Sequence, residues 1–359
     1  MFNFLSLKPE SFGLDFSDSA LRLVKLRRKG NDYNIASYSE ISIPSGIIMN
    51  GEIKDENVLA DHIKKLISSV KGSSLGTKYV VASLPEKKAF LRVIQMPCLS
   101  EDDLKSAVVF EAENYIPMST SEVYLDSQII SNIKQKDQEH YDVLIAALPK
   151  KTVDPYFSVL KKAGLTPTAL EIESFSIVRT LIKDNESCPV GIIDLQPSRT
   201  AFILFSGKTL TDSFTIAISS KEFVDSIRRN LEVDEKTAEK LKNKYGLENE
   251  KAQGKKVFDA LTPVITDLVE QIKKYLDYYN THNDCDVSGK NKLEKVILTG
   301  DISLKKFKEI LESQLSLKVE MGNPWVNITK DKIDNNFPKE KELRFTSAIG
   351  LALRGIKRQ

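Results

Sequence analysis

Two stretches of the 359-residue chain place an aspartate at the end of an apolar segment and hydroxyl side chains in the polar turn that follows. A turn between two antiparallel strands exposes consecutive backbone amides. Two such turns that face one another can hold the phosphates of a nucleotide, with the aspartates acting on Mg²⁺. A single Asp in a β-turn is usually structural, so the chemistry depends on the pair. The candidate residues are Asp15 with Ser17 and Ser19, and Asp194 with Ser198 and Thr200.

These two stretches also echo one another. FGLDFSDSALRLVKL near the start and VGIIDLQPSRTAFILF in the middle each contain a strand ending in Asp, a polar turn and a second apolar strand. Two copies of one turn predict a duplicated fold.

Other kinds of site find little support in the sequence. The three histidines lie in unrelated contexts, without an HExxH motif or a paired spacing that could hold a metal, and no GxSxG motif supports a serine hydrolase. Cys98, Cys188 and Cys285 are far apart and show no CxxC spacing, which favours a reducing cytoplasm.

Charge and hydropathy exclude further classes of protein. The 52 Lys and Arg residues nearly balance the 50 Asp and Glu residues, so the formal net charge of +2 provides no chain-wide basic field for nucleic acid. No segment approaches the length of about 18 continuous apolar residues that a membrane span needs, and the start MFNFLSLKPE does not resemble a signal peptide. We therefore expect a cytoplasmic protein that meets a membrane only through a partner.

The elements that must position the candidate residues follow from hydrophobic periodicity. In the first half we expect a meander of strands (12–16, 21–26, 33–43), a helix (55–70) and a strand (79–84). A small α+β insert follows, with strands 89–96, 123–130 and 142–148, a helix capped at Ser100, and a helix over 154–163. A strand (169–173) and a helix (175–183) are expected to complete the first unit.

The second half repeats the meander and then adds helices. We expect strands 190–194, 201–205 and 209–216, followed by helices 221–230, 235–244 and 263–280, the last with Pro263 in its first turn. A strand (295–298), a helix (304–315), a strand (317–321) and a small-residue helix (345–354) complete the chain.

Several longer motifs carry a family resemblance over essentially the whole chain. They are GLDFSDSALRLVKL, IPSGIIMNGEIKD, FEAENYIP, IIDLQPSRTAFILFSGKTL, AEKLKNKYG, VILTGD, and NPW with FTSAIGLALRG. The chain thereby resembles the actin-like ATPase superfamily, specifically the type IV pilus assembly PilM family, a relative of FtsA. This resemblance implies an α/β, actin-like (ribonuclease H-like) duplicated fold with an inserted subdomain of the PilM/FtsA (SHS2) type. The implied subdomains are 1A (1–85, completed by about 166–188 and 342–359), 1C (86–165), 2A (189–218 and 292–341) and 2B (219–291).

The same resemblance implies ATP or ADP with Mg²⁺ as ligands. Both aspartates would act on Mg²⁺ through water, and Glu239 and Lys242, three apart on one helical face, would reach the ribose and adenine. Taken alone, this pair is better explained as a surface contact, and only its position after the second phosphate turn favours the nucleotide. The implied cofactor-binding residues are Asp15, Ser17, Ser19, Asp194, Ser198, Thr200, Glu239, Lys242 and Gly300.

The chain departs from the family pattern at the phosphate segments. The family has Gly two residues after each Asp because close backbone approach to phosphate leaves no room for a side chain, and here Ser17 and Gln196 stand at these positions. The adenosine loop keeps only Gly300, and no residue is identifiable as a water-activating base. At most a weak ATPase activity is expected.

The resemblance also implies a partner, the N-terminal cytoplasmic peptide of a PilN-like inner-membrane protein, bound in a groove between the first unit and the insert. Further contacts with other inner-membrane components of the pilus machine would hold the protein at the inner face of the cytoplasmic membrane. The expected groove walls are Leu84, Val108, Ile116 and Pro117, although core packing explains each of these equally well.

Three other functions remain open from the sequence. One is an enzyme, either an active ATPase or a small-molecule kinase of the same superfamily; such kinases carry a substrate lid and an acceptor-site acid, and no third Asp-centred turn is found. An FtsA-like filament protein would carry a membrane-targeting tail, whereas this chain ends at LRGIKRQ. The cytoplasmic portion of a type II secretion protein has a similar build.

Overall fold

The computed structural model describes residues 10–30, 32–135, 138–183, 185–186, 188–206, 209–282, 293–328 and 337–357. The chain forms two compact units, each with its own hydrophobic core. Unit 1 comprises Met1–Glu186, Lys208–Thr211 and Asn323–Gln359, and unit 2 comprises Ser187–Gly207 and Asp212–Gly322. Cys285 lies outside the described residues.

Unit 1 is built on a six-stranded sheet with the order β11-β7-β1-β2-β3-β6. The predicted meander is present as β1 (Ser11–Phe16), β2 (Ala20–Lys29) and β3 (Asp32–Ser42), paired antiparallel. β7 (Tyr79–Leu84) runs parallel to β1, and β11 (Thr166–Ile172) runs parallel to β7. The short strands are β6 (Lys71–Gly72) at the far edge and the β4 (Ile48–Met49) and β5 (Glu52–Ile53) pair. Asp15 therefore lies near the end of a central strand.

Helices cover both faces of this sheet. α1 (Glu56–Ser68), which begins where the Asp55 carboxylate accepts the amides of Asn57 and Val58, shares a core with α3 (Lys150–Lys162). α9 (Thr346–Lys357) covers the other face and contacts α4 (Glu173–Leu181). Gly350 allows this close approach, because a Cβ atom there would lie 1.9 Å from the Ser176 carbonyl oxygen.

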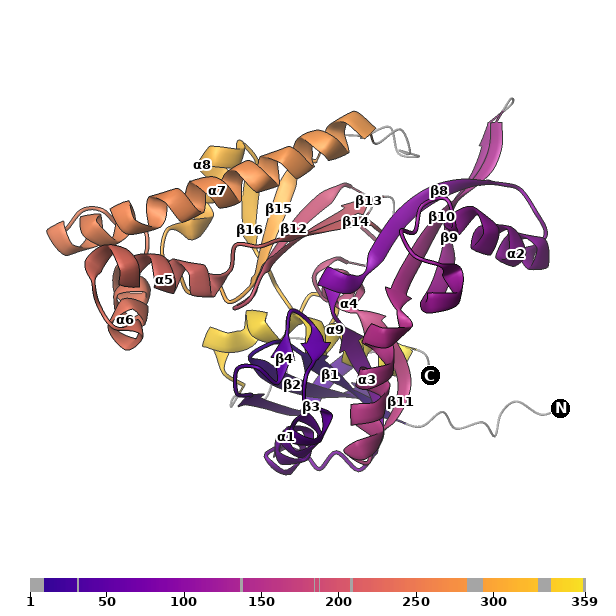
Figure 1. Ribbon diagram of the computed structural model, residues 1–359, viewed down its shortest axis with the longest axis horizontal. Coiled ribbons are helices and arrows are strands. Elements are labelled where there is room, and N and C mark those ends of the chain that lie inside the picture. Colours follow the sequence, from indigo (N-terminus) through magenta and orange to yellow (C-terminus); the bar gives the residue numbers. More distant parts are fainter. Residues whose placement is uncertain are drawn as a thin grey trace. The chain divides into compact units, whose positions relative to one another are not determined.

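The insert forms a three-stranded sheet with the order β8-β10-β9 and one packed helix (Figure 1). Its elements are β8 (Phe90–Pro97), α2 (Glu101–Ala112), β9 (Val123–Gln135) and β10 (Gln138–Pro149), with the turns η2 (Glu86–Lys88) and η3 (Thr120–Glu122). Ser100 caps α2 as predicted, since its hydroxyl oxygen accepts the Asp103 amide at 3.3 Å. Leu104, Val108 and Ala112, spaced four apart, turn one face of α2 into the core of the insert.

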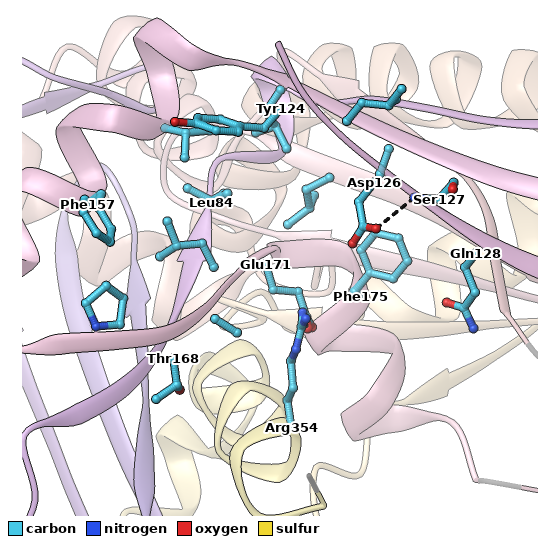
Figure 2. Close-up of a pocket in the computed structure, with 18 of the residues that line it drawn as sticks. Leu84, Tyr124, Asp126, Ser127, Gln128, Phe157, Thr168, Glu171, Phe175 and Arg354 are labelled. Atoms are coloured by element: carbon cyan, nitrogen blue, oxygen red, sulfur yellow. Dashed lines mark hydrogen bonds and ion pairs between the residues drawn. The ribbon is translucent and has the colours of Figure 1, made fainter. Parts of the chain in front are cut away.

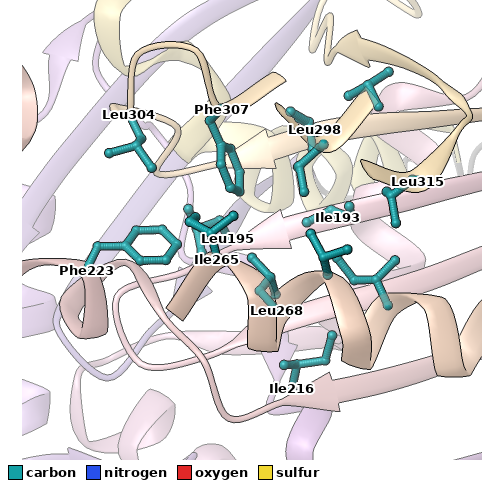
Figure 3. Close-up of a cluster of buried hydrophobic side chains, with 14 of the residues drawn as sticks. Ile193, Leu195, Ile216, Phe223, Ile265, Leu268, Leu298, Leu304, Phe307 and Leu315 are labelled. Carbon is teal, nitrogen blue, oxygen red and sulfur yellow. The ribbon is translucent and has the colours of Figure 1, made fainter. Parts of the chain in front are cut away.

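Unit 2 is built on a five-stranded sheet with the order β14-β13-β12-β15-β16. The strands are β12 (Val190–Leu195), β13 (Thr200–Ser206), β14 (Thr209–Ile216), β15 (Lys295–Gly300) and β16 (Lys318–Met321). The helices are α5 (Ser220–Leu231), α6 (Glu235–Tyr245), α7 (Ala252–His282) and α8 (Phe307–Leu315). Figure 3 shows Ile265 and Leu268 of α7 packed toward Ile193 and Leu195 of β12.

The two sheets share one strand order, which confirms the duplicated α/β fold. In each, a three-stranded antiparallel meander (β3-β2-β1 or β14-β13-β12) is extended by two parallel strands (β7-β11 or β15-β16). The first strand of each meander is central, so both candidate aspartates occupy equivalent positions. Among the described residues, no helix combines the length and the apolar character needed to cross a bilayer.

Two expectations from the sequence need correction. α7 begins at Ala252, not at Pro263, because Val257, Ala260 and Leu261 extend its buried stripe and hold the proline within the helix. Residues 323–341, expected in subdomain 2A, belong to unit 1, where Trp325 and Phe337 pack with Tyr38. The η5 turn (Lys339–Phe345) then leads into α9.

Candidate functional site

Asp15, the first candidate for Mg²⁺, is buried beside a cation. The strand register places Arg22 opposite Asp15, and Nη1 of Arg22 lies 3.6 Å from Oδ2 of Asp15. The hydroxyl of Ser347 in α9 donates to Oδ1 of Asp15 at 2.7 Å. Asp15 and Arg22 are only 4% and 3% exposed. The carboxylate is thus already compensated within unit 1.

Arg22 is itself held by a second carboxylate. Its Nε donates to Glu40 at 3.0 Å, and Lys341 donates to the other oxygen of Glu40 at 3.0 Å. Burial acts to raise the pKa of Glu40, but the charges and hydrogen bonds of Arg22 and Lys341 outweigh it and hold the pKa below its ordinary value.

The turn after β1 satisfies its own polar groups. The Ser17 amide donates to the Ala20 carbonyl at 2.9 Å, and the Ser17 hydroxyl both donates to that carbonyl and accepts the Ala20 amide. Ser19 is half-buried beside it. Asp18, which is not among the predicted residues, accepts the amides of Asn50 and Gly51 at 3.0 and 3.1 Å and links the following loop to the turn.

Asp194, the second candidate, lies under an amide side chain. Nε2 of Gln196 donates to both carboxylate oxygens of Asp194, at 2.9 and 3.0 Å, and Asp194 is 1% exposed. Gly300 lies against the same group in a left-handed conformation (φ 93°), and a Cβ atom there would be 2.7 Å from Oδ1 of Asp194. The structure therefore brings Asp194, Gln196 and Gly300 together in unit 2.

The remaining residues of unit 2 that were predicted to bind a nucleotide differ in their exposure to solvent. Thr200 is fully buried and its hydroxyl donates to the Ile218 carbonyl at 2.7 Å, whereas Ser198 is exposed at the turn. On α6, Glu239 is exposed and Lys242 is 4% exposed. Their roles toward a nucleotide stay predictions.

These arrangements do not suit a hydrated Mg²⁺. Carboxylates that serve the ion through water need oxygens open to that water. Both aspartates are instead buried and bonded to protein donors, Ser347 and Gln196. Within the described part of the chain, no group of three or more His, Cys, Asp and Glu side chains is arranged to hold a metal ion.

A groove of about 880 Å³ lies within unit 1, where the insert meets the six-stranded sheet (Figure 2). Residues 124–128 of β9 and 144, 146 and 148 of β10 form the insert side. Residues 167–172 of β11 form the sheet side, with Leu84, Phe175 and Arg354. Both apolar and hydrogen-bonding side chains line it.

Both long walls of this groove are edge strands. β11 is the outer strand of the six-stranded sheet, and β9 is the outer strand of the insert sheet. Consecutive residues of each strand line the groove, although successive side chains of a strand point to opposite faces. The backbone of each strand therefore borders the groove, and an edge strand can pair with a further chain.

A buried ion cluster forms the floor. Arg179 of α4 donates to both oxygens of Glu171, at 2.6 and 3.1 Å, and Arg354 of α9 also donates to Glu171. Figure 2 shows Glu171 and Arg354 meeting there. Glu171 is 4% exposed, so this cluster joins β11, α4 and α9 beneath the groove.

Aromatic side chains stand at one end of the groove. Tyr124 and Phe157 are 50% and 41% exposed, although both are large and apolar. The Tyr124 hydroxyl donates to Asp154 at 3.0 Å, and that hydrogen bond raises the pKa of Tyr124. The bond restrains the orientation of the Tyr124 ring.

The four predicted wall residues lie in different environments. Leu84 lines the groove, whereas Val108 and Ile116 are in the core of the insert, and Pro117 is exposed and does not line the groove. The strands that form β9 and β11 were predicted from the sequence, but their place along the groove, and that of Arg354, was not. The strand segment TPTALEI, with few large apolar residues, was a usable signal of an edge strand.

Comparison with known proteins addresses the family. A family model described as type IV pilus assembly protein PilM matches residues 13–356. A solved PilM-PilN type IV pilus biogenesis complex is similar, with a TM-score of 0.81, 26% identity, and coverage of 98% of this chain and 99% of that chain.

Two more distant structures share the fold. The ethanolamine utilization protein EutJ from Carboxydothermus hydrogenoformans has a TM-score of 0.56 at 13% identity, over 97% of this chain and 90% of that chain. MreB 5 of Spiroplasma citri bound to AMPPNP has a TM-score of 0.56 at 12% identity, over 98% of each chain. They confirm the actin-like fold expected from the motifs. With the family model spanning nearly the whole sequence, the chain belongs to the PilM family of type IV pilus assembly proteins.

Proposed function

We propose that this protein serves type IV pilus assembly by capturing the N-terminal cytoplasmic peptide of a PilN-like inner-membrane protein in the groove between β9 and β11. The observation that carries the proposal is a groove bordered by two edge strands. The similar solved structure, a PilM-PilN complex, supports the identity of the partner.

The geometry favours an extended peptide. A chain laid along β9 or β11 gains backbone hydrogen bonds from the open strand edge, and its alternate side chains enter pockets on either side. Leu144, Leu148 and Phe175 supply apolar contacts, while Tyr124 and Phe157 flank one end. Backbone pairing provides affinity, and the pockets select the sequence.

The same contact would determine where in the cell the protein acts. Held by a peptide that emerges from the membrane, the protein acts in the cytoplasm at the inner face of the cytoplasmic membrane. Other inner-membrane components of the pilus machine are expected to join the complex through further surfaces.

The test is a calorimetric titration of the whole protein with a synthetic peptide that carries the N-terminal cytoplasmic sequence of the PilN-like protein of the same organism (the PilN-type peptide). Binding in the micromolar range with one peptide per chain is expected, and a scrambled peptide should not bind. Absence of micromolar binding, both with and without ATP, would contradict the proposal.

The proposal includes ATP or ADP as a weakly held structural or switching ligand, not as a fuel. The actin-like fold supports binding, and MreB 5, which shares this fold, is bound to AMPPNP. The covered carboxylate of Asp194 opposes tight binding with Mg²⁺.

Replacing Gln196 by Gly is expected to tighten binding of Mg²⁺-ATP about tenfold, or ~1.4 kcal/mol, because it removes the amide group that donates to both oxygens of Asp194. The gain should vanish in excess EDTA, because it arises from access of Mg²⁺ to Asp194. Titration with a fluorescent ATP analogue measures it. Gln196→Ala should show the same direction, and Gln271→Ala, on the exposed face of α7, should show no change. Equal affinities in all four proteins would contradict this account of Gln196.

A further inference from the structure

The outer face of α2 carries exposed apolar side chains that no other part of the described chain covers. Phe110 is 74% exposed and Val109 is 46% exposed, and Leu99, just before the helix, is 36% exposed. The opposite face of the same helix is already used, because Leu104, Val108 and Ala112 fill the core of the insert. The apolar residues of α2 therefore exceed what the fold requires.

Acidic side chains surround this apolar face. With 3.6 residues per turn, Asp103, Ser106, Phe110 and Glu113 follow one another at intervals of three, four and three along one side of the helix. Asp102, Ser106, Val109 and Glu113 form the adjacent row, and the Asp102 side chain is 99% exposed. The basic residue of this segment, Lys105, lies to one side and pairs with Asp102 at 3.8 Å.

We propose that the outer face of α2 (Asp102, Asp103, Ser106, Val109, Phe110 and Glu113) is a second docking surface for a partner protein, which presents an apolar pocket or helix face flanked by Lys and Arg. Phe110 is the anchor, since a large aromatic side chain contributes most when a partner desolvates it. The acidic residues set the orientation and speed encounter with a basic partner.

Charge complementarity selects this occupant over two others. An anionic lipid surface would be repelled by the three carboxylates. A symmetric contact with a second copy would place two acidic faces against each other. The surface belongs to the insert, on α2, whereas the groove is lined by β9 and β10 of the insert and by β11 (Figure 1). One protein could therefore bind the PilN-type peptide and a basic partner at the same time.

The probe for this surface is an 18-residue amphipathic helical peptide of Leu and Lys, added to the whole protein that is saturated with the PilN-type peptide. We expect binding by fluorescence anisotropy that weakens as NaCl is raised. Phe110→Ala and Asp102→Lys should each weaken it roughly tenfold or more. Tyr278→Ala, which removes an exposed aromatic from α7 in unit 2, should leave it unchanged. Circular dichroism confirms that each variant is folded.

The expected results separate this inference from the groove. Unchanged affinity in Phe110→Ala, equal binding of a Leu and Glu peptide, or displacement of the Leu and Lys peptide by the PilN-type peptide would each overturn it. The inference would also be overturned if the protein sedimented with vesicles of phosphatidylcholine and phosphatidylserine. Self-association of the protein that Phe110→Ala abolishes would overturn it as well. If the PilN-type peptide itself fails to bind, the Leu and Lys titration is run without it, and its outcome still decides the role of α2.

Discussion

Replacing Ala169 by Trp is expected to lower the affinity for the PilN-type peptide by about two orders of magnitude, or ~2.7 kcal/mol. Ala169 lies on the edge strand β11 among the residues that line the groove, and its small side chain leaves the groove open. An indole at this position occupies the space of the peptide and displaces it from the strand edge. Calorimetry with the whole protein measures the loss.

Thr166→Trp is the matched control for this substitution. Thr166 lies three residues earlier on β11, is exposed and does not line the groove. Its peptide affinity should equal that of the unchanged protein. The thermal unfolding midpoints of both variants should stay near the original value, since neither side chain enters the core. If Ala169→Trp binds as tightly as Thr166→Trp, the peptide does not occupy this groove.

Replacing Glu171 by Gln is expected to lower the free energy of unfolding by about 3 kcal/mol, because removal of one partner of a buried ion cluster leaves the other charges uncompensated. Glu171 is 4% exposed and joins Arg179 and Arg354, and the side chains of these arginines are 24% and 19% exposed. The amide cannot neutralise either of them. Urea denaturation followed by circular dichroism gives the difference.

An exposed ion pair provides the comparison for Glu171. Asp61 pairs with Lys64 at 3.1 Å on α1, with both side chains more than half exposed. Asp61→Asn should leave the urea midpoint unchanged, since water screens such pairs. An equal midpoint for Glu171→Gln would show that the cluster is dispensable. Because the cluster forms the groove floor, the Gln variant should also bind the PilN-type peptide more weakly.

Local patterns were enough to predict most of the fold. The alternation of apolar residues in the two meanders and the helical stripe of α1 report local geometry, and these elements formed as expected. The long helix was predicted only in part, because the local preference of Pro263 predicts a helix start at that residue. Packing of Val257, Ala260 and Leu261 outweighs the local preference of a proline for the first turn.

The groove shows what local sequence patterns could not predict. Val108 and Leu84 are both apolar and both buried, and only the packing of the insert decides that the first faces a core while the second lines a groove. Glu171 and Arg354 lie 183 positions apart, and no periodicity links them. These two side chains come together because α9 packs against the six-stranded sheet of unit 1.

By itself, the sequence determined the duplicated strand-turn-strand units and the family, because both are encoded in short contiguous motifs. It placed Asp15 and Asp194 at the ends of the first strands of these units, and the sheet order of the structure made both strands central. Only the tertiary structure decided that Arg22 and Gln196 engage these carboxylates, and that the two edge strands β9 and β11 border a groove. The reason is physical: strand register, side-chain rotamers and sheet edges are set by contacts between distant residues, which local spacing does not record.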